Sequence, residues 1–283
     1  MVKMLKKPSP AKINLFLRVL GKRPDGYHNI FSLMQKITLC DELTFLPRSG
    51  GIVLKCPNSD LPVSKDNLVF RAAESILSYA GCSSGVEIIL TKYIPAAAGL
   101  GGGSSDAATT LLALNEMYQL GLTKAELMQL GAKLGADVPF FIFGDSAFAA
   151  GIGDQLTAWE NPLKLNIVLI NPLFPLPTKL VYESLNLRLT KEKINYSIPR
   201  LSALSDITSE MHNDLEAASF KMHPELIELK QLLLRHGALS AMMSGSGPTV
   251  FGIFTDEITA KKTAEAIKKE VPRQFHVFFV QSL

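Results

Sequence analysis

A glycine-rich segment that directly precedes a strongly helical stretch carries the clearest chemical signal in the sequence. Four glycines and two serines fall within residues 95–107. Glycine tolerates positive φ angles and lets the backbone approach a ligand closely, so several amides can point at one anion. We expect a helix over residues 106–120 with Ser104 or Ser105 as its N-cap, and its dipole adds to the attraction. The segment predicts a phosphate-binding loop, with a purely structural turn as the alternative.

The loop differs from two common nucleotide-binding fingerprints. No Gly-Lys pair in the chain is followed by Ser or Thr, and no G-x-G-x-x-G sequence opens a helix. It is therefore neither a Walker A motif nor a dinucleotide fingerprint. The predicted phosphate-binding residues are Pro95, Ala96, Ala97, Ala98, Gly99, Leu100, Gly101, Gly102, Gly103, Ser104 and Ser105.

Phosphoryl transfer also needs a group that takes the proton of the acceptor and a cation that stabilises the developing charge. Asp137 is the candidate base, because it follows a predicted helix end and precedes apolar residues that can shift a carboxyl pKa. Lys12 is the candidate cation, since it begins an otherwise apolar strand and shares a face with Asn14. A capping role for Asp137 and a solvated position for Lys12 are the alternatives.

A second glycine loop, residues 244–249, lies between two predicted strands, and a simple hairpin turn would explain it equally well. Residues 25–28, 177–182 and 212–216 are candidates for recognising an acceptor. Their aromatic rings could stack on a planar base, as rings do in nucleic-acid sites. The loop residues that we single out are Ser244, Gly245, Ser246 and Gly247.

These motifs resemble those of the GHMP kinase superfamily, over nearly the whole chain. Residues 10–17 (PAKINLFL) match its opening motif, residues 95–107 its phosphate motif P-x-x-x-G-L-G-S-S-x-A, and residues 244–249 its third motif. The resemblance implies an α+β, two-domain fold: an N-terminal domain like that of ribosomal protein S5, a C-terminal ferredoxin-like domain, and the active site in the cleft between them. It also implies that the third motif lies near the phosphate loop.

The resemblance further implies ATP as co-substrate, with Mg²⁺ delivered by ATP. Lys12 and Asp137 would be the catalytic pair, Asp137 lying in a segment, GADVPFF, that matches the family's catalytic aspartate. Asn67 and Lys92 resemble positions that contact the adenine end of ATP, although Asn67 is also a plausible helix cap. No cluster of carboxylates nominates a dedicated metal site.

The expanded form G-L-G-G-G-S-S is similar to that of superfamily members that phosphorylate a cytidine diphosphate conjugate of methylerythritol in isoprenoid biosynthesis. By that likeness Tyr27, His28 and Tyr182 hold the cytidine, Tyr182 lying four positions after Thr178. Substrate contacts are accordingly expected for Asn14, Tyr27, His28, Thr178 and Tyr182. A kinase acting on homoserine, mevalonate or a sugar, and a non-catalytic nucleotide-binding protein, are the alternatives.

The elements that must position these residues follow from periodicity and from turn and capping signals. Helices interleaved with strands indicate an open sheet covered on one face, with domains over residues 1–158 and 159–283. We expect strands over residues 13–19, 37–46, 86–90, 165–170, 238–243, 249–254 and 275–280, with two more between 147 and 159. We expect helices over 67–79, 106–120, from 123 (a Thr123–Glu126 capping box) to 135, over 224–236, and after Thr255, with loops at 171–177 and 188–199.

Composition sets the remaining expectations. The chain of 283 residues has 47% hydrophobic and 19% charged residues and a net charge of +3, without a dense basic patch beyond its first residues. We therefore expect no nucleic-acid or membrane partner. A monomer or weak homodimer is a separate expectation, which does not follow from composition. Three cysteines without a C-x-x-C pair argue against disulfides and a thiolate metal site, which is typical of a reducing cytoplasm.

Overall fold

The computed structural model describes residues 3–185 and 197–283. The chain forms two compact units from interleaved segments: the first from Met1–Ala11, Leu39–Ile94 and Gly101–Asp145, the second from Lys12–Thr38, Pro95–Leu100 and Ser146–Leu283. The expected α+β class is confirmed. The domain boundary expected between residues 158 and 159 stays a prediction.

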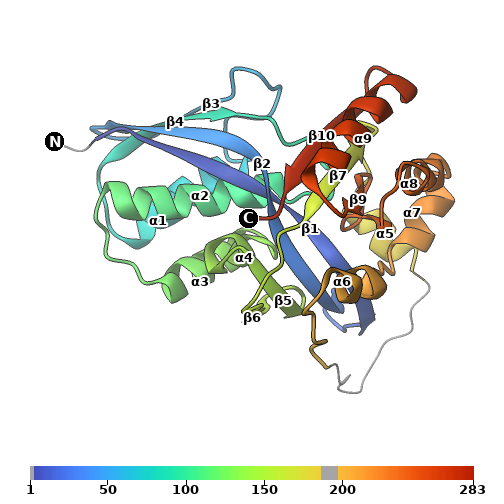
Figure 1. Cartoon of the computed structure of the whole chain (residues 1–283). Helices are drawn as coiled ribbons and strands as arrows, with labels where there is room; N and C mark the ends of the chain where they lie inside the picture. Colours follow the sequence, from blue (N-terminus) through green and yellow to red (C-terminus); the bar gives the residue numbers. More distant parts are fainter. Residues whose placement is uncertain (1–2, 186–196) are drawn as a thin grey trace. The chain divides into compact units, whose positions relative to one another are not determined.

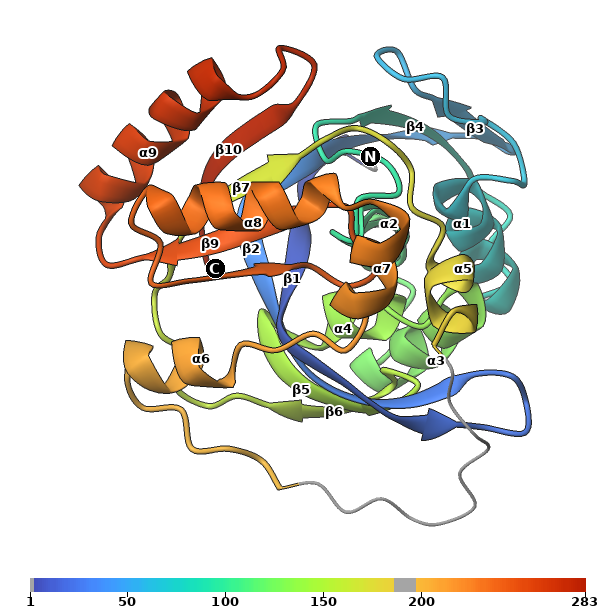
Figure 2. The ribbon, with the colours of Figure 1, turned by 90° about the vertical axis from the view of Figure 1, so that its right-hand side faces the viewer.

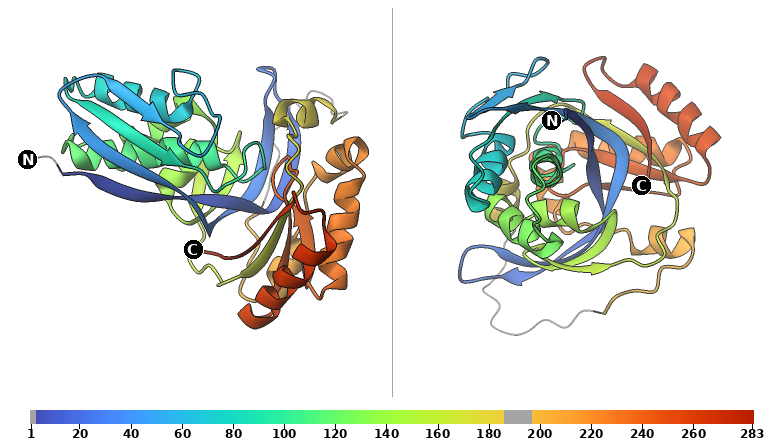
Figure 3. Two further views of the ribbon diagram at one scale, coloured as in Figure 1. Left: turned by 90° about the horizontal axis from the view of Figure 1, so that it is seen from above. Right: turned by 90° about the vertical axis from the view of Figure 1, so that its left-hand side faces the viewer.

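Two long paired strands, β1 (Leu5–Lys22) and β2 (His28–Arg48), contribute residues to both units (Figure 3). Both are longer than the alternating stretches at 13–19 and 37–46 that the sequence predicts. Consecutive residues are buried over 11–17 and 30–37, so both faces of these strands are covered there. Polar residues such as Ser32 and Gln35 are among the buried ones.

In the first unit, helices lie beside a small sheet whose strand order is β3–β4–β2 (Figure 1). β4 runs parallel to β3 and antiparallel to residues 42–48 of β2. The Asn67 side chain caps α1 by accepting from the Val69 amide, and the predicted Thr123–Glu126 capping box begins α3. The elements are β3 (Ile52–Lys55), α1 (Leu68–Tyr79), β4 (Gly85–Thr91), α2 (Gly102–Met117), α3 (Lys124–Leu134) and α4 (Val138–Phe143).

Helix α2 begins earlier than its sequence predicts. Gly101, with φ +69°, is its N-cap, so the expectation of an N-cap at Ser104 or Ser105 and a start at residue 106 is wrong. The reason is that Gly102 and Gly103 adopt helical geometry and form the first turn. The helix ends at Met117 rather than at 120, and Gln119 with φ +50° already lies outside it. Nearly every residue from 105 to 114 is buried, so α2 is a central helix of this unit.

In the second unit, a sheet of order β10–β7–β9–β8 is covered on one face by α8 and α9 (Figure 2). Strand residues such as Val168, Met243 and Val250 pack in one apolar core with the buried residues of both helices. A hairpin of β5 and β6 extends residues 30–35 of β2. The elements are β5 (Ser146–Gly151), β6 (Gln155–Ala158), β7 (Asn166–Asn171), α5 (Thr178–Glu183), α6 (Leu204–Glu210), α7 (Glu216–Met222), α8 (Glu225–Arg235), β8 (Ser240–Met243), β9 (Val250–Phe254), α9 (Glu257–Glu270) and β10 (His276–Gln281).

Some local expectations fail for identifiable reasons. Asp256, not Thr255, caps α9, because its carboxylate accepts from the Thr259 amide. The short helices α4 to α7 have six or seven residues each, too few to establish a helical period in the sequence. Most of the loop expected at 188–199 lies outside the described residues.

Candidate active site

In the second unit, the first strand presents a buried chain of polar side chains. Lys12 is 4% exposed, and its Nζ donates to Asn14 Oδ1 at 2.6 Å. Asn14 Nδ2 donates to Ser32 Oγ at 2.8 Å, and Ser32 Oγ donates to the Phe16 carbonyl at 2.6 Å. Each group is fixed by the next, so the ammonium group of Lys12 has a defined position. The alternative of a solvated surface lysine is therefore wrong.

The second glycine loop connects β8 to β9 as a hairpin, and it also contacts the first part of the phosphate loop. Ser244 Oγ donates to the Gly99 carbonyl at 3.0 Å, and the Thr249 amide donates to the Ala98 carbonyl at 3.3 Å. The Lys12 amide donates to the Leu100 carbonyl at 2.9 Å. Three segments distant in sequence therefore meet in this unit.

Two glycines make this approach possible. Gly99 has φ +74°, and an added Cβ would lie 2.1 Å from the Ser244 carbonyl oxygen. Gly245 has φ +56°, and an added Cβ would lie 3.4 Å from Asn14 Oδ1 and 3.5 Å from Lys12 Nζ. A side chain at Gly99 would overlap backbone, which cannot move aside easily. The loop of residues 244–249 thus packs its backbone against the polar chain of the first strand.

Segment 212–216 holds the loop of residues 244–249 in place. The sequence of the segment did not indicate this role. Asn213 is 3% exposed, and its Nδ2 donates to the carbonyls of Met243 and Gly245, at 2.8 Å each. Glu216 accepts from the Met243 amide at 2.9 Å. The same segment also contacts β1, where the Leu17 amide donates to the His212 carbonyl. Its predicted role in acceptor recognition stays a prediction.

The three aromatic residues proposed for a planar base differ in exposure. Tyr27 is 58% exposed, whereas His28 is buried, and the ring centroids of His28 and Tyr182 lie 5.1 Å apart. Burial, with a smaller contribution from Lys22, lowers the pKa of His28. Its Nε2 is buried and has no hydrogen-bond partner among the described residues. Such a nitrogen is suited to a ligand, because a buried polar atom without a partner is costly.

Thr178 is tied to the second glycine loop. Its hydroxyl lies 2.8 Å from Ser246 Oγ, and the Ser219 hydroxyl donates to the Ser246 carbonyl at 3.2 Å. Thr178 is exposed at the start of α5, and Tyr182 lies one turn later in the same helix. The helix therefore links the loop to the aromatic pair.

In the first unit, the second half of the phosphate loop is the first turn of α2. The first intrahelical bond is donated by Ser105 to the Gly101 carbonyl at 2.9 Å, so the amides of Gly102, Gly103 and Ser104 precede the helical ladder. The N-cap glycine has no side chain that could accept from them. These amides, together with the helix dipole, are suited to binding an anion.

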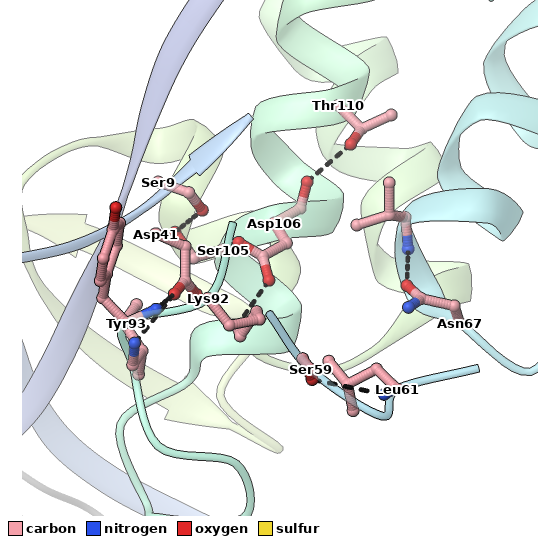
Figure 4. A network of polar contacts seen from close by, with 12 residues as sticks. Ser9, Asp41, Ser59, Leu61, Asn67, Lys92, Tyr93, Ser105, Asp106 and Thr110 are labelled. Carbon is pink, nitrogen blue, oxygen red and sulfur yellow. Dashed lines mark hydrogen bonds and ion pairs between the residues drawn. The ribbon is translucent and has the colours of Figure 1, made fainter. Parts of the chain in front are cut away.

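The loop serines differ in their surroundings. Ser105 is fully buried, and its Oγ accepts from Ser9 Oγ at 2.8 Å (Figure 4). Ser104 is partly exposed, and a Cβ added to Gly135 would lie 3.9 Å from its Oγ. Gly135, two residues before the candidate base Asp137, therefore lies close to Ser104 of the phosphate loop.

Asp137 is partly buried at the N-terminus of α4, and its side chain makes no capping bond there. Asp137 therefore does not cap α4, and the alternative that it caps a neighbouring turn is untested. Its pairing with Lys12 and its role as base stay predictions.

Asn67 and Lys92, assigned to the adenine end of ATP, are both engaged within the first unit. Asn67 Nδ2 donates to the Pro62 carbonyl at 2.8 Å, while its Oδ1 caps α1 (Figure 4). Lys92 forms ion pairs with Asp41 and Asp106 (Figure 4). The contact of either residue with ATP stays a prediction.

Among residues 3–185 and 197–283, no three or more His, Cys, Asp or Glu side chains are grouped so as to hold a metal ion. Cys40, Cys56 and Cys82 are not joined in disulfides. Within the described part of the chain, no helix has the length and apolar character needed to span a membrane.

Comparison with known proteins identifies the family of this chain. The description "GHMP kinases N terminal domain" matches residues 67–145, and "GHMP kinases C terminal" matches residues 194–273. The chain belongs to the GHMP kinase family and is a small-molecule kinase, for which ATP is the phosphate donor. Relatives within that family carry a more particular name.

The chain is similar to the 4-diphosphocytidyl-2-C-methyl-D-erythritol kinases of Syntrophus aciditrophicus (55% identity, 99% of this chain and 100% of the relative) and Geobacter metallireducens (46%, 94% and 95%). It also matches a crystal structure of 4-(cytidine 5'-diphospho)-2C-methyl-D-erythritol kinase with a TM-score of 0.83 and 35% identity, covering 99% of this chain and 100% of the other. A homoserine kinase from Cytophaga hutchinsonii, at 20% identity and a TM-score of 0.74, covering 100% of this chain and 95% of the other, shares the fold.

We predict that Gly99→Ala disrupts the kinase much more than Gly81→Ala. Both glycines have positive φ, but nothing lies within 4 Å of a Cβ at Gly81. Backbone strain alone should cost about 1 kcal/mol at either position, and the overlap at Gly99 should add roughly 1–3 kcal/mol. Urea unfolding measures both costs, and kcat/KM for ATP should fall ~10–100-fold in Gly99→Ala alone. Equal effects of the two substitutions would contradict the close contact.

Proposed function

We propose that this kinase transfers the γ-phosphoryl group of ATP to the 2-hydroxyl group of 4-diphosphocytidyl-2-C-methyl-D-erythritol, giving the 2-phosphate and ADP in non-mevalonate isoprenoid precursor biosynthesis. The names of relatives at 46% and 55% identity support this substrate. The structural observation that carries the proposal is the buried Nε2 of His28, which has no hydrogen-bond partner among the described residues and lies in a ring that contacts Tyr182.

A cytosine ring fits the chemistry of this aromatic pair. Its edge carries both hydrogen-bond donors and acceptors, so a neutral imidazole can pair with it in either tautomer. The lowered pKa of His28 keeps the ring neutral near pH 7. The exposed ring of Tyr27 and the partly buried ring of Tyr182 supply faces on which a base can stack.

The nucleotide phosphates are assigned to the first turn of α2. The amides of Gly102, Gly103 and Ser104 would donate to phosphate oxygens, where the helix dipole favours negative charge. Mg²⁺ would arrive with ATP, bound to phosphate oxygens whose charge it screens. Because Ser105 is buried and bonded to Ser9, Ser104 is the loop serine better placed to meet the nucleotide.

Catalysis is assigned to Lys12 and Asp137. The ammonium group of Lys12, fixed by Asn14, would stabilise negative charge on the acceptor oxygen, and Asp137 would take its proton. A loose phosphoryl-transfer transition state requires little early deprotonation, so positioning contributes much of the rate.

A different alcohol acceptor is the second candidate. The similarity to homoserine kinase is one of fold, which does not determine the acceptor. The choice depends on residues outside the shared loops, and His28 with Tyr182 favours the cytidine conjugate.

We predict ADP release from ATP and Mg²⁺ with the cytidine diphosphate conjugate, and none above background with homoserine, mevalonate or galactose. A coupled assay of the purified protein measures this. Lys12→Ala should abolish turnover, because the cation at the acceptor is lost, while ADP binding measured by calorimetry persists. Turnover of another alcohol would refute the assigned acceptor, and full activity of Lys12→Ala would remove Lys12 from the mechanism.

We further predict that His28→Ala raises KM for the cytidine conjugate about 10–100-fold with a smaller change in kcat, since loss of a buried polar contact costs roughly 1–3 kcal/mol. His276→Ala, at an exposed position of β10, is the matched control. Because the pKa of His28 lies below its ordinary value of 6.5, KM should be constant above that pH and rise only on further acidification. A KM unchanged by the substitution would exclude His28 from the site.

A further inference from the structure

Two buried carboxylates share one lysine in the first unit (Figure 4). Lys92 Nζ contacts Asp41 Oδ2, and it donates to Asp106 Oδ2 at 2.8 Å. The side chains of the two aspartates are 0% and 2% exposed. With all three groups ionised, the group would carry one uncompensated negative charge in a buried place.

This group holds the chain at both ends of the phosphate loop. Asp41 Oδ1 accepts from the amides of Tyr93 and Ile94, at 2.6 and 2.8 Å, which fixes the residues that lead into the loop. Asp106 lies in α2, four residues after its first residue Gly102. Lys92 joins the two ends, and a Cβ added to Gly102 would lie 3.3 Å from its Nζ.

Asp106 has one oxygen that nothing satisfies within the described chain. Its Oδ1 is buried without a hydrogen-bond partner among the described residues. Burial raises the pKa of Asp106 to about 7, against the opposing effect of Lys92 and with a further rise from Asp41. An ionised carboxylate in such a position is costly, and a proton on Oδ1 removes the uncompensated charge.

The other groups near Asp106 among the described residues do not supply a positive charge that would neutralise the extra negative one. Ser9, on β1, lies near enough to lower the pKa of Asp106, while its hydroxyl donates to Ser105 Oγ. The thiol of Cys56 is near enough that Asp106 raises its pKa, but burial is the larger cause and keeps it neutral. The buried residues of α1, α3 and α4 include no titratable side chain.

We propose that Asp106 is a proton acceptor linked to nucleotide binding: phosphate groups at the first turn of α2 favour the protonation of Asp106 Oδ1 from solvent, while Asp41 and Lys92 hold the loop ends in place. Asp41 and Lys92 act as positioning residues. The inference rests on the phosphate assignment made under Proposed function. No bond other than that to the proton forms or breaks.

The physical cause is competition for one helix end. The free N-terminus of α2 favours an ionised Asp106 through its dipole, because the carboxylate lies near the positive end. Bound phosphates take over that interaction and place further negative charge beyond Gly102, whose Cα lies about 6 Å along the axis from that of Asp106. Both effects favour the protonated form of Asp106.

Calorimetric titration with ADP at pH 7, in PIPES and in imidazole, measures the number of protons taken up per nucleotide. The wild type should take up as much as about half a proton, because Asp106 is half protonated at a pH equal to its pKa. Asp106→Asn should bind ADP without this uptake, since its amide keeps an oxygen for Lys92 and a donor in place of the proton. Asp60→Asn, at an exposed position, is the matched control and should behave as the wild type.

Asp41→Asn tests whether the charge of Asp41 affects proton uptake by Asp106, or whether Asp41 only holds the loop in place. Removing one carboxylate lowers the pKa of Asp106, so the pH of greatest proton uptake should move to lower values. A carboxyl ¹³C titration of the unmutated protein needs no variant, and Asp106 should titrate near pH 7 and at higher pH with ADP bound.

Equal proton uptake by the wild type and Asp106→Asn would overturn the linkage and leave the proposed function standing. An Asp106 carboxyl that titrates near pH 4 with and without ADP would overturn it in the same way. Failure of the wild type to bind ADP would instead overturn both the linkage and the phosphate assignment.

Discussion

The uncapped N-terminus of α2 is the constraint on which the site depends. An α-helix leaves its first amides without acceptors, and most helices satisfy them with a side-chain oxygen at the N-cap. Here the N-cap is Gly101 in a left-handed conformation, which contributes no such oxygen. Donors therefore remain at the end of a helix that is buried along most of its length. The proposed phosphate oxygens would accept from these donors.

The remaining contacts of the loop fix its backbone rather than bind an anion. In the second unit, Gly99 lies so close to the Ser244 carbonyl that no side chain fits, and Asn213 holds the loop of residues 244–249 from its other side. In the first unit, Asp41 and Lys92 hold the residues before the loop. Preorganised donors lose little freedom on binding, which is how a phosphate site gains both affinity and rate.

Much of this arrangement could be predicted from local sequence signals. The capping box of α3, the strand β4 before the loop and the hairpin of β5 and β6 depend on neighbouring residues, and each was found where expected. The start of α2 was misplaced because glycine is a poor helix former, yet Gly102 and Gly103 form the first turn of this helix.

Contacts between residues distant in sequence could not be predicted from the residues alone. Asp41 lies 51 positions before Lys92, and its own strand gave no sign that its carboxylate would accept from two amides ahead of the loop. The support that Asn213 gives to the loop depends on how residues 212–214 pair with Leu17 of β1. The proximity of His28 to Tyr182 was expected only through the family resemblance, because no local pattern links β2 to α5.

A crystal structure with a non-hydrolysable ATP analogue would show whether the N-terminus of α2 binds the phosphates. We expect phosphate oxygens within hydrogen-bond distance of the amides of Gly102, Gly103 and Ser104, along the axis of α2. Triphosphate bound elsewhere, with these amides turned to solvent, would contradict it.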